Sequence, residues 1–394
     1  MECGEDCLYI RRTILKNKSR KDQQMYCKKI NVRGFRNIEE AEVSFSEGVN
    51  ILVGENAQGK TNLLEAVFYP SVGRSFRGAH TPEMIGFGKK SAEILIDFRD
   101  SKRDQNIKVT LFKDKQRKIE KNGIKMDKLS DIVGSFRAVL FCPEHLSMIK
   151  DGPSERRVYM DMAISRMYPM YMHSLQKYSY ILKQRNALIK GAYNDRRAFD
   201  ATVELWSAQL AHEAAIIAEA RLKFVRRVSG HVADIFAEMT GEREIPTLRY
   251  NGCSGQAEDE YLDREATEEK YFSLLMSSHD REIAIGSTLY GIHKDDLDIF
   301  LNGKSARLFA SQGQQRSLAL ALKLAEGEIC CEEFGDNPVF LFDDVLSELD
   351  ETRRDYLVHK IHGKQVIITS CEAGLFSGMD GVKRIRVESG EYFE

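Results

Sequence analysis

Residues 54–61 of the chain read Gly54-Glu55-Asn56-Ala57-Gln58-Gly59-Lys60-Thr61. Residues 50–53 before them, of which Ile51, Leu52 and Val53 are apolar, are typical of a buried strand, and residues 62–67 after them read as the start of a helix. A strand, a glycine-containing loop and a helix in this order form the context of a phosphate-binding loop. An ordinary glycine-rich turn is the alternative, but it requires neither flank. The pattern therefore predicts nucleotide binding.

The residue types within this loop each suit a phosphate ligand. Gly54 and Gly59 let the backbone wrap closely around a phosphate, and the N-terminus of the following helix adds partial positive charge. Lys60 is predicted to reach the β- and γ-phosphates, and the Thr61 hydroxyl is predicted to ligate Mg²⁺.

Composition sets wider limits on the kind of protein. The 394 residues are 42% hydrophobic and 30% charged, which is typical of a globular protein of two or three domains. Neither a long apolar run nor the apolar core of a signal peptide is present, so a cytoplasmic protein with no membrane contact is predicted. The eight cysteines lack zinc-site spacing and are predicted to be reduced. A net charge of −2 means that any nucleic-acid contact requires a local basic patch.

The pattern divides the chain into four parts. Residues 1–24 hold six basic and four acidic side chains without apolar periodicity, so they are predicted to be disordered, or to precede a true start at Met25. Short strands are predicted throughout residues 25–150, long helices in residues 151–289, and strands again in residues 290–394. The strands of the first half are predicted at residues 28–33, 40–45, 49–53, 92–98, 107–112 and 137–142.

A basic segment lies within the first strand-rich part. Residues 101–128 hold ten Lys or Arg side chains against four Asp or Glu, and Asn122-Gly123 at their centre predicts a tight hairpin turn. The segment is either a solvated hairpin face, which charge runs usually are, or a ridge that contacts phosphates. The sequence does not decide between these two interpretations.

The helical part shows apolar stripes at spacings of three and four residues. One stripe runs through residues 175–189 and another through residues 203–217, which predicts an antiparallel helical arm over about residues 151–240. Trp206 lies on the second stripe, where an aromatic side chain is more often part of a core than of a cofactor site. The acidic residues 257–270 are predicted to form a solvated loop or short helix.

Two further motifs follow the helical part. Ser311 precedes a helical run and is predicted to cap it, while Gly313 lets the backbone approach a ligand at that helix start. Asp343 and Asp344 end the apolar strand that begins near residue 339. Asp343 is predicted to hold Mg²⁺, and Asp344 to polarise an attacking water molecule.

Together these motifs resemble the ATP-binding-cassette (ABC) ATPases, in particular the SMC-like DNA-repair branch and, within it, the RecF family. The resemblance covers residue 25 to the C-terminus. Besides residues 54–66, it is carried by Gly73-Arg74-Ser75-Phe76-Arg77, Ser311-Gln312-Gly313-Gln314-Gln315-Arg316 and Phe342-Asp343-Asp344-Val345-Leu346-Ser347-Glu348-Leu349-Asp350. It implies an α/β fold: an ABC-ATPase head, which is a P-loop NTPase with a mixed sheet, interrupted by the helical arm 151–289.

The resemblance also implies roles for individual residues. Those expected to bind ATP are Gly54, Glu55, Asn56, Ala57, Gln58, Gly59, Lys60, Thr61 and Asn62, with Ser311, Gly313 and Gln314 acting on the nucleotide of a second subunit. Those expected to take part in hydrolysis are Lys60, Asp343, Asp344, Ser311 and Glu144, and those expected to hold Mg²⁺ are Thr61 and Asp343. The candidates for DNA contact are Arg74, Arg77, Lys113, Lys115, Arg117 and Lys118.

The chain departs from the family pattern at several positions. Asp344 stands where transporter-type cassettes usually have Glu, and its shorter side chain favours slow turnover. Ser370 replaces the switch histidine of many cassettes, and Glu144 takes the place of the glutamine of the Gln-loop. Arg77 matches a basic position that SMC-like ATPases use near DNA, although a solvated loop arginine is the alternative.

The resemblance implies an ATP-dependent homodimer that closes on duplex DNA, favours junctions with single-stranded gaps and turns ATP over slowly. It also implies work with RecR and RecO, which helps RecA to load, and a place in the bacterial cytosol near the nucleoid. An architectural SMC-like clamp, a transporter-type ATPase subunit and a small-molecule kinase are the alternatives. The kinase shares only the phosphate loop, and the Asp-Asp pair and the helical arm disfavour the transporter subunit.

Overall fold

The computed structural model describes residues 24–241, 243–371 and 381–394. The predicted tail, up to residue 23, therefore lies outside the described residues. The chain forms two compact units. The first runs to Pro143 and resumes at Glu326, and the second comprises Glu144–Ala325.

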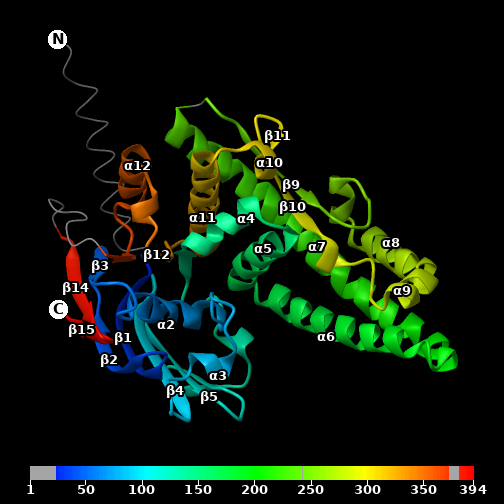
Figure 1. Ribbon diagram of the computed structural model, residues 1–394, viewed down its shortest axis with the longest axis horizontal. Helices are drawn as coiled ribbons and strands as arrows, with labels where there is room; N and C mark the ends of the chain where they lie inside the picture. The colour runs from blue at the N-terminus through cyan, green and yellow to red at the C-terminus, as the bar shows by residue number, and fades with distance from the viewer. Residues whose placement is uncertain (1–23, 242, 372–380) are drawn as a thin grey trace. The chain divides into compact units, whose positions relative to one another are not determined.

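A six-stranded sheet in the order β15-β14-β3-β13-β12-β8 forms the centre of the first unit (Figure 1). Its neighbours pair in parallel, except for β14 and β15, which form an antiparallel hairpin. The inner strands are apolar and buried, as a parallel sheet covered on both faces requires. The strands are β3 Val49–Val53, β8 Ala138–Phe141, β12 Val339–Asp343, β13 Val366–Ser370, β14 Lys383–Glu388 and β15 Glu391–Phe393.

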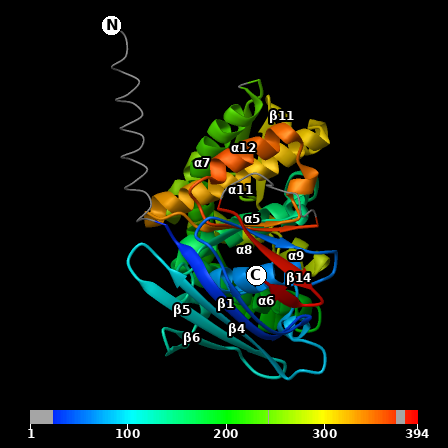
Figure 2. The same ribbon diagram turned by 90° about the vertical axis from the view of Figure 1, so that its left-hand side faces the viewer.

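The second sheet of this unit is antiparallel and has the order β2-β1-β4-β5-β6-β7 (Figure 2). Buried and partly exposed residues alternate along β4 and β5, so one face packs on the core. Asn122 and Gly123 have φ angles of 52° and 77°, which form the predicted hairpin turn between β6 and β7. The strands are β1 Tyr26–Phe35, β2 Ile38–Ser44, β4 Ser91–Arg99, β5 Asp104–Phe112, β6 Lys118–Lys121 and β7 Ile124–Met126.

Helix α2, Lys60–Val72, begins directly at the phosphate-loop pattern and contacts strands of both sheets. Nearly all its residues after the first turn are buried, so its sequence is apolar on every side. Gly73 ends it with a φ of 68°. Two other helices of the unit are the short α3, Thr81–Met84, and α12, Glu351–Ile361.

The second unit contains the predicted helical arm. Side chains on α6 meet α7 at Tyr171–Arg221, Lys177–Glu213 and Arg185–Ser207, so the two helices run antiparallel. The 45-residue α7 starts at the cap Asp195, whose side chain accepts a hydrogen bond from the Ala198 N–H. The helices are α4 Ser147–Lys150, α5 Pro153–Met167, α6 Pro169–Gly191, α7 Arg196–Thr240, α8 Arg264–Ser277, α9 His279–Ile285, α10 Ala306–Phe309 and α11 Gln312–Phe334, whose last turns belong to the first unit.

A small sheet completes this unit and was not predicted in full. Strands β9 Pro246–Asn251 and β11 Lys304–Ser305 pair on either side of β10 Asp296–Leu301. Because β10 pairs with β9, the residues after 290 belong to the arm, so the second unit extends beyond the predicted limit at residue 289. The helices of the described residues include none that is long and apolar enough to cross a membrane.

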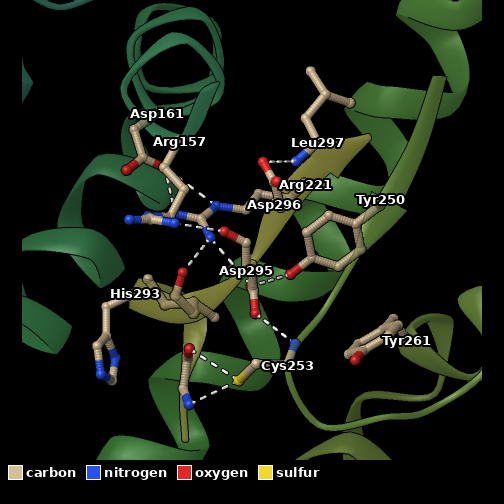
Figure 3. A network of polar contacts seen from close by, with 12 residues as sticks. Arg157, Asp161, Arg221, Tyr250, Cys253, Tyr261, His293, Asp295, Asp296 and Leu297 are labelled. Carbon is tan, nitrogen blue, oxygen red and sulfur yellow. Dashed lines mark hydrogen bonds and ion pairs between the residues drawn. The ribbon is translucent and has the colours of Figure 1, made fainter. Parts of the chain in front are cut away.

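Buried charges tie the elements of this unit together. Figure 3 shows the carboxylate of Asp295 between the guanidinium of Arg221, 3.2 Å away, and the hydroxyl of Tyr250, which donates to it. The Cys253 N–H donates to the same carboxylate at 3.0 Å, and Arg221 also pairs with Asp161 at 2.9 Å. Burial raises the pKa of Asp295, and the positive charge of Arg221 opposes that rise.

The residues around Asp295 reach further helices. Asp296 forms a two-pronged ion pair with Arg156 of α5, at 2.7 and 2.9 Å. A separate pair, Arg185 of α6 and Glu282 of α9, lies 2.7 Å apart with both side chains fully buried. Asp295 and Asp296 thus link α5, α7 and β9 to the start of β10, while the pair Arg185–Glu282 links α6 to α9.

His293 lies in the same turn and is held as a neutral imidazole. Its Nδ1 lies 2.6 Å from the Tyr178 hydroxyl and its Nε2 lies 3.2 Å from the Thr288 carbonyl. The neutral ring fits both partners, because Nε2–H donates to the carbonyl while Nδ1 accepts from the hydroxyl. Burial lowers the pKa of His293 from 6.5 to about 4, although the Thr288 carbonyl opposes the shift.

This shift predicts a pH-dependent stability. The unfolded chain binds a proton at His293 below pH 6.5 and the folded chain does so only near pH 4, so the contribution is complete above pH 6.5 and is lost as the pH falls toward 4. At about 1.4 kcal/mol per pKa unit, it amounts to on the order of 3 kcal/mol. Urea unfolding at pH 7 and pH 4.5 should therefore show a smaller acid loss for His293→Gln than for the wild type.

The half-exposed His212 of α7 offers a matched control. His212→Gln should keep the acid loss of the wild type. An equal acid loss in His293→Gln and the wild type would contradict the assignment of the effect to His293.

Candidate functional site

The phosphate-loop pattern forms a loop between β3 and α2, as predicted. Ala57 and Gly59 have φ angles of 65° and 115°, so the chain reverses sharply before the helix. A Cβ on Gly54 would lie 2.3 Å from the Val387 carbonyl oxygen, so no larger residue fits there. Since the residue that caps α2 is Gly59, no capping side chain occupies the helix N-terminus, and its N–H groups can face an anion.

Lys60 lies across this loop. Its ammonium donates to the carbonyls of Gly54 at 2.6 Å and Glu55 at 2.7 Å, and the residue is 6% exposed. The Cys371 thiol, at the end of β13, lies 3.5 Å from the same ammonium. The positive charge is thereby held where a phosphate group would enter the loop.

The predicted metal ligands Thr61 and Asp343 are in contact. The Thr61 hydroxyl donates to Asp343 Oδ1 at 2.8 Å, and the hydroxyl of Thr369 on β13 donates to the same oxygen at 2.7 Å. Thr369 also accepts from the Asp344 N–H at 2.9 Å, so it orients both acids of the pair. Thr369 was not predicted as a site residue, because its one local signal is its place at the end of a strand.

Asp344 directly follows β12, and Ser370 ends the neighbouring strand β13. Asp344 has a φ of 51°, a conformation that costs a side chain other than glycine about 1 kcal/mol. Ser370, in the switch position, is 5% exposed, and its carbonyl accepts a hydrogen bond from the Gly54 N–H at 3.3 Å. Ser370 thus anchors the start of the phosphate loop through its backbone.

These groups surround a cavity of about 310 Å³ at the carboxyl end of the sheet. It is lined by Asn37, Asn56, Ala57, Gly59, Lys60, Thr61, Asn62, Arg77, Asp344 and Thr369. Beside it lies a shallower hollow of about 620 Å³, which shares Asn37, Asn62 and Arg77 with it. The hollow is also lined by Arg36, Pro82, Glu83, Ile85, Phe87 and Lys113. The two spaces therefore meet along one edge.

Glu65 of α2 lies in the stretch 54–66 that carries the family resemblance, and no role was predicted for it. Its fully buried carboxylate accepts two hydrogen bonds of 2.9 Å from Arg36 and one from the Ser75 hydroxyl. Arg77 lies 4.0 Å from the same carboxylate and donates to the Asn62 side chain at 3.0 Å. Glu65 thereby positions Arg36 in the hollow and Arg77 at the edge that the hollow shares with the cavity.

The other candidates for DNA contact lie in different surroundings. Lys113 lines the shallow hollow, and the ammonium of Lys115 lies 4.0 Å from the centre of the Phe112 ring. Arg117 donates to the Tyr69 hydroxyl at 2.7 Å and to the Gly73 carbonyl, which holds the end of α2. Lys118 pairs with Glu120 at 2.8 Å, and Arg74 is exposed. Arg77 and Lys113 are thus the two candidates that share a hollow.

The signature residues lie in the second unit. Ser311 caps α11 as predicted, because its hydroxyl accepts from the Gln314 N–H at 3.3 Å while the Gln314 side chain accepts from the Ser311 N–H at 2.7 Å. Ser311 is exposed, and Gly313 and Gln314 are partly exposed. Glu144 lies in the 3-10 turn Pro143–Leu146 and is not among the residues that line the cavity. Its role in place of the Gln-loop residue stays a prediction.

Comparison with known proteins identifies relatives along nearly the whole chain. Residues 26–392 match the family model described as the RecF/RecN/SMC N terminal domain. A protein of Ruminiclostridium cellulolyticum, described as DNA replication and repair protein RecF, is 38% identical over 346 residues, which cover 88% of this chain and 92% of the relative. The protein of the same description from Clostridium acetobutylicum is 36% identical, with 89% and 94% covered.

Solved structures give the same answer. The structure described as the recombination mediator protein RecF-ATPrS in the RecFOR pathway has a TM-score of 0.88 at 34% identity, with 94% of this chain and 98% of that chain covered. An Smc head domain of Pyrococcus furiosus has a TM-score of 0.52 at 18% identity, over 94% and 96% of the two chains, and is similar in fold alone. The predicted fold, an SMC-like ABC-ATPase head with an inserted helical arm, is confirmed, and the chain belongs to the RecF proteins of the RecF/RecN/SMC family.

Proposed function

We propose that the chain is an ATPase of recombinational DNA repair that dimerises on duplex DNA when ATP is bound. The observation that carries this proposal is the shared Asp343 oxygen, which brings the Thr61 hydroxyl of the phosphate loop against the acidic strand end. A solved structure at 34% identity is described as RecF-ATP, which supports ATP as the nucleotide.

ATP binding follows from the loop and its lysine. The N–H groups at the start of α2 and the Lys60 ammonium face the β- and γ-phosphates. Pro82 and Ile85 of the adjoining hollow would offer apolar surface to the ribose and base, and Asn37, which lines both spaces, would offer an amide. Arg77, at the edge common to both spaces, is in reach of the same ligand.

Magnesium fits the residues beside the loop. Thr61 and Asp343 present hard oxygen atoms, and Mg²⁺ in nucleotide sites uses one or two such protein ligands together with phosphates and water. When bound, the ion supplies charge that stabilises the transferring phosphoryl group. Thr369 keeps the Asp343 carboxylate turned toward Thr61. Asp344, on the rim of the cavity, orients the attacking water molecule and accepts its proton.

The dimer is closed by the nucleotide. Ser311, Gly313 and Gln314 of one subunit contact the γ-phosphate held by the other, so ATP joins the subunits and hydrolysis releases them. The exposed start of α11 supports this role, because the capping serine is presented to solvent in the single chain. Slow hydrolysis keeps the clamp on duplex DNA at single-strand gap junctions. RecR and RecO act with it there to load RecA, in replication restart and the SOS response.

Sedimentation velocity tests the nucleotide-driven dimer. The wild type should sediment as a dimer only with ATP and Mg²⁺, and a gapped duplex should strengthen the association. Lys60→Ala should remain monomeric and lose roughly tenfold to a hundredfold in ATP affinity, because a charge-assisted phosphate contact is removed. Lys89→Ala changes an exposed lysine of the same unit and should behave as the wild type. An oligomeric state indifferent to ATP would overturn the mechanism.

The second acid is tested by Asp344→Asn. This variant should bind ATP with wild-type affinity, lose roughly a hundredfold or more in hydrolysis rate, and accumulate as the closed dimer, because the water molecule loses its base. Phosphate release and sedimentation measure the two effects. Asp355→Asn changes an exposed acid on α12 and serves as the control. Normal turnover in Asp344→Asn would remove Asp344 from the catalytic residues.

The contribution of the basic segment 101–128 to DNA binding is tested by the salt dependence of affinity. The double change Lys113→Ala and Lys115→Ala should lower the slope of log affinity against log salt by about one to two, since each lost phosphate contact removes about one. Lys118→Ala should change the slope less, because Glu120 holds that ammonium. An unchanged slope in the double variant would assign the segment to a solvated face.

A further inference from the structure

The phosphate loop is in contact with a segment more than 300 residues away in the sequence. Strand β14 lies beside β3 in parallel, with Arg386 opposite Val53, the last residue before the loop. One residue further on, the Val387 carbonyl lies directly against Gly54 and excludes any side chain there. The first residue of the loop therefore rests on the C-terminal hairpin formed by β14, β15 and the turn Ser389–Gly390.

The turn of this hairpin holds Gln58. The Gly390 N–H donates to the Gln58 carbonyl at 2.8 Å, and the Ser389 N–H donates to the Gln58 side-chain oxygen at 2.5 Å. Both turn residues have positive φ angles, 51° for Ser389 and 84° for Gly390, which turn the two N–H groups toward the loop. A Cβ on Gly390 would lie 2.8 Å from the Asn37 carbonyl oxygen, so the turn is fitted closely to its place.

Tyr392 of β15 holds the next residue of the loop. Its hydroxyl donates to the Gly59 carbonyl at 3.0 Å, and a Cβ on Gly59 would lie 3.3 Å from that hydroxyl. Burial raises the pKa of Tyr392, so the hydroxyl keeps its proton and remains a donor. Hydrogen-bond donors of the C-terminal hairpin thus contact both Gln58 and Gly59 of the loop.

Peptide geometry gives these contacts a consequence for the ligand. In a trans peptide the C=O of one residue and the N–H of the next point in opposite directions. The Gly390 N–H holds the Gln58 carbonyl, and the Tyr392 hydroxyl holds the Gly59 carbonyl together with the Leu63 N–H of α2, so the N–H groups of Gly59 and Lys60 are turned away from the hairpin. These N–H groups lie where a phosphate-binding loop contacts its ligand.

We infer that the C-terminal hairpin orients the phosphate loop, with Tyr392 and the turn Ser389–Gly390 as positioning residues for nucleotide binding. The inference rests on the proposed ATP site, because it assigns the hairpin to that site. Neither the phosphate-loop pattern nor the acidic strand end includes these residues.

Tyr392→Phe tests the inference, because it removes the hydroxyl and keeps the ring. Equilibrium binding of mant-ATP and mant-ADP should weaken roughly fivefold for both nucleotides, the size of one lost hydrogen bond. In steady-state hydrolysis KM should rise by the same factor while kcat stays within about twofold, because the contact is made before and during the reaction alike. The melting temperature without nucleotide should fall by no more than about 4 °C, the shift that about 1 kcal/mol produces in a domain of this size.

Phe393→Leu is the matched control, since Phe393 is the next residue of β15 and is exposed beside Arg386. It should bind both nucleotides as the wild type does. A second variant, Gly390→Ala, should weaken binding more than Tyr392→Phe, because the added methyl group displaces the turn from Asn37.

The outcomes separate this inference from the proposed function. Wild-type affinity in Tyr392→Phe and Gly390→Ala, beside a wild type that binds ATP, would overturn the inference and leave the ATP site intact. A wild type that fails to bind either nucleotide would overturn the site itself. Equal losses of affinity and melting temperature in Tyr392→Phe and Phe393→Leu would show that the hairpin contributes only to the stability of the fold. That result would overturn the inference as well.

Discussion

The parallel pairing of β13 between β3 and β12 is the constraint on which the candidate site depends. Its register sets Ser370 beside Val53 and Thr369 beside Asp343, so three strand ends meet at one edge of the sheet. A slip of one residue would turn the Thr369 hydroxyl to the opposite face and leave Asp343 without it. Ligand sites in parallel sheets form at this edge because loops and helix N-termini converge there. The phosphate loop is thus functional only in the context of strands that lie more than 280 residues further along the chain.

The buried carboxylate of Glu65 also contributes to the site at this edge of the sheet. Glu65 is fully buried and would be costly alone, but Arg36 and Ser75 satisfy its oxygens. The carboxylate in turn restrains the guanidinium groups of Arg36 and Arg77, which would otherwise adopt many rotamers. Arg77 is therefore presented to the cavity by α2, the helix that carries Lys60 and Thr61. This arrangement joins the segment 73–77 to the nucleotide site by contacts within the first unit.

Patterns confined to one segment predicted the fold well. The strand before Gly54, the Asn122–Gly123 turn and the stripes of α6 and α7 are local, and the structure confirms them. Features whose role depends on distant partners were not predicted. Thr369 acts through Asp343, Tyr392 acts through Gly59, and β9 is a strand only because it pairs with β10. The role of Glu65 was equally hidden, since a lone acid in an apolar helix does not reveal its arginine. The basic segment 101–128 stays open, because its members divide between paired, packed and exposed positions.

The wholly buried pair of Arg185 and Glu282 has a consequence for how this arm changes over generations. Losing either partner leaves an uncompensated charge in the core, at a cost of about 3–5 kcal/mol, whereas replacing both by apolar residues of similar volume is often neutral. That cost is a large share of the stability of an ordinary domain. The intact ion pair and its double apolar replacement are both stable, whereas a chain with only one of the two residues replaced is not. Descendants of this sequence should keep both residues or exchange both together, so the two codons are coupled although nearly a hundred positions separate them.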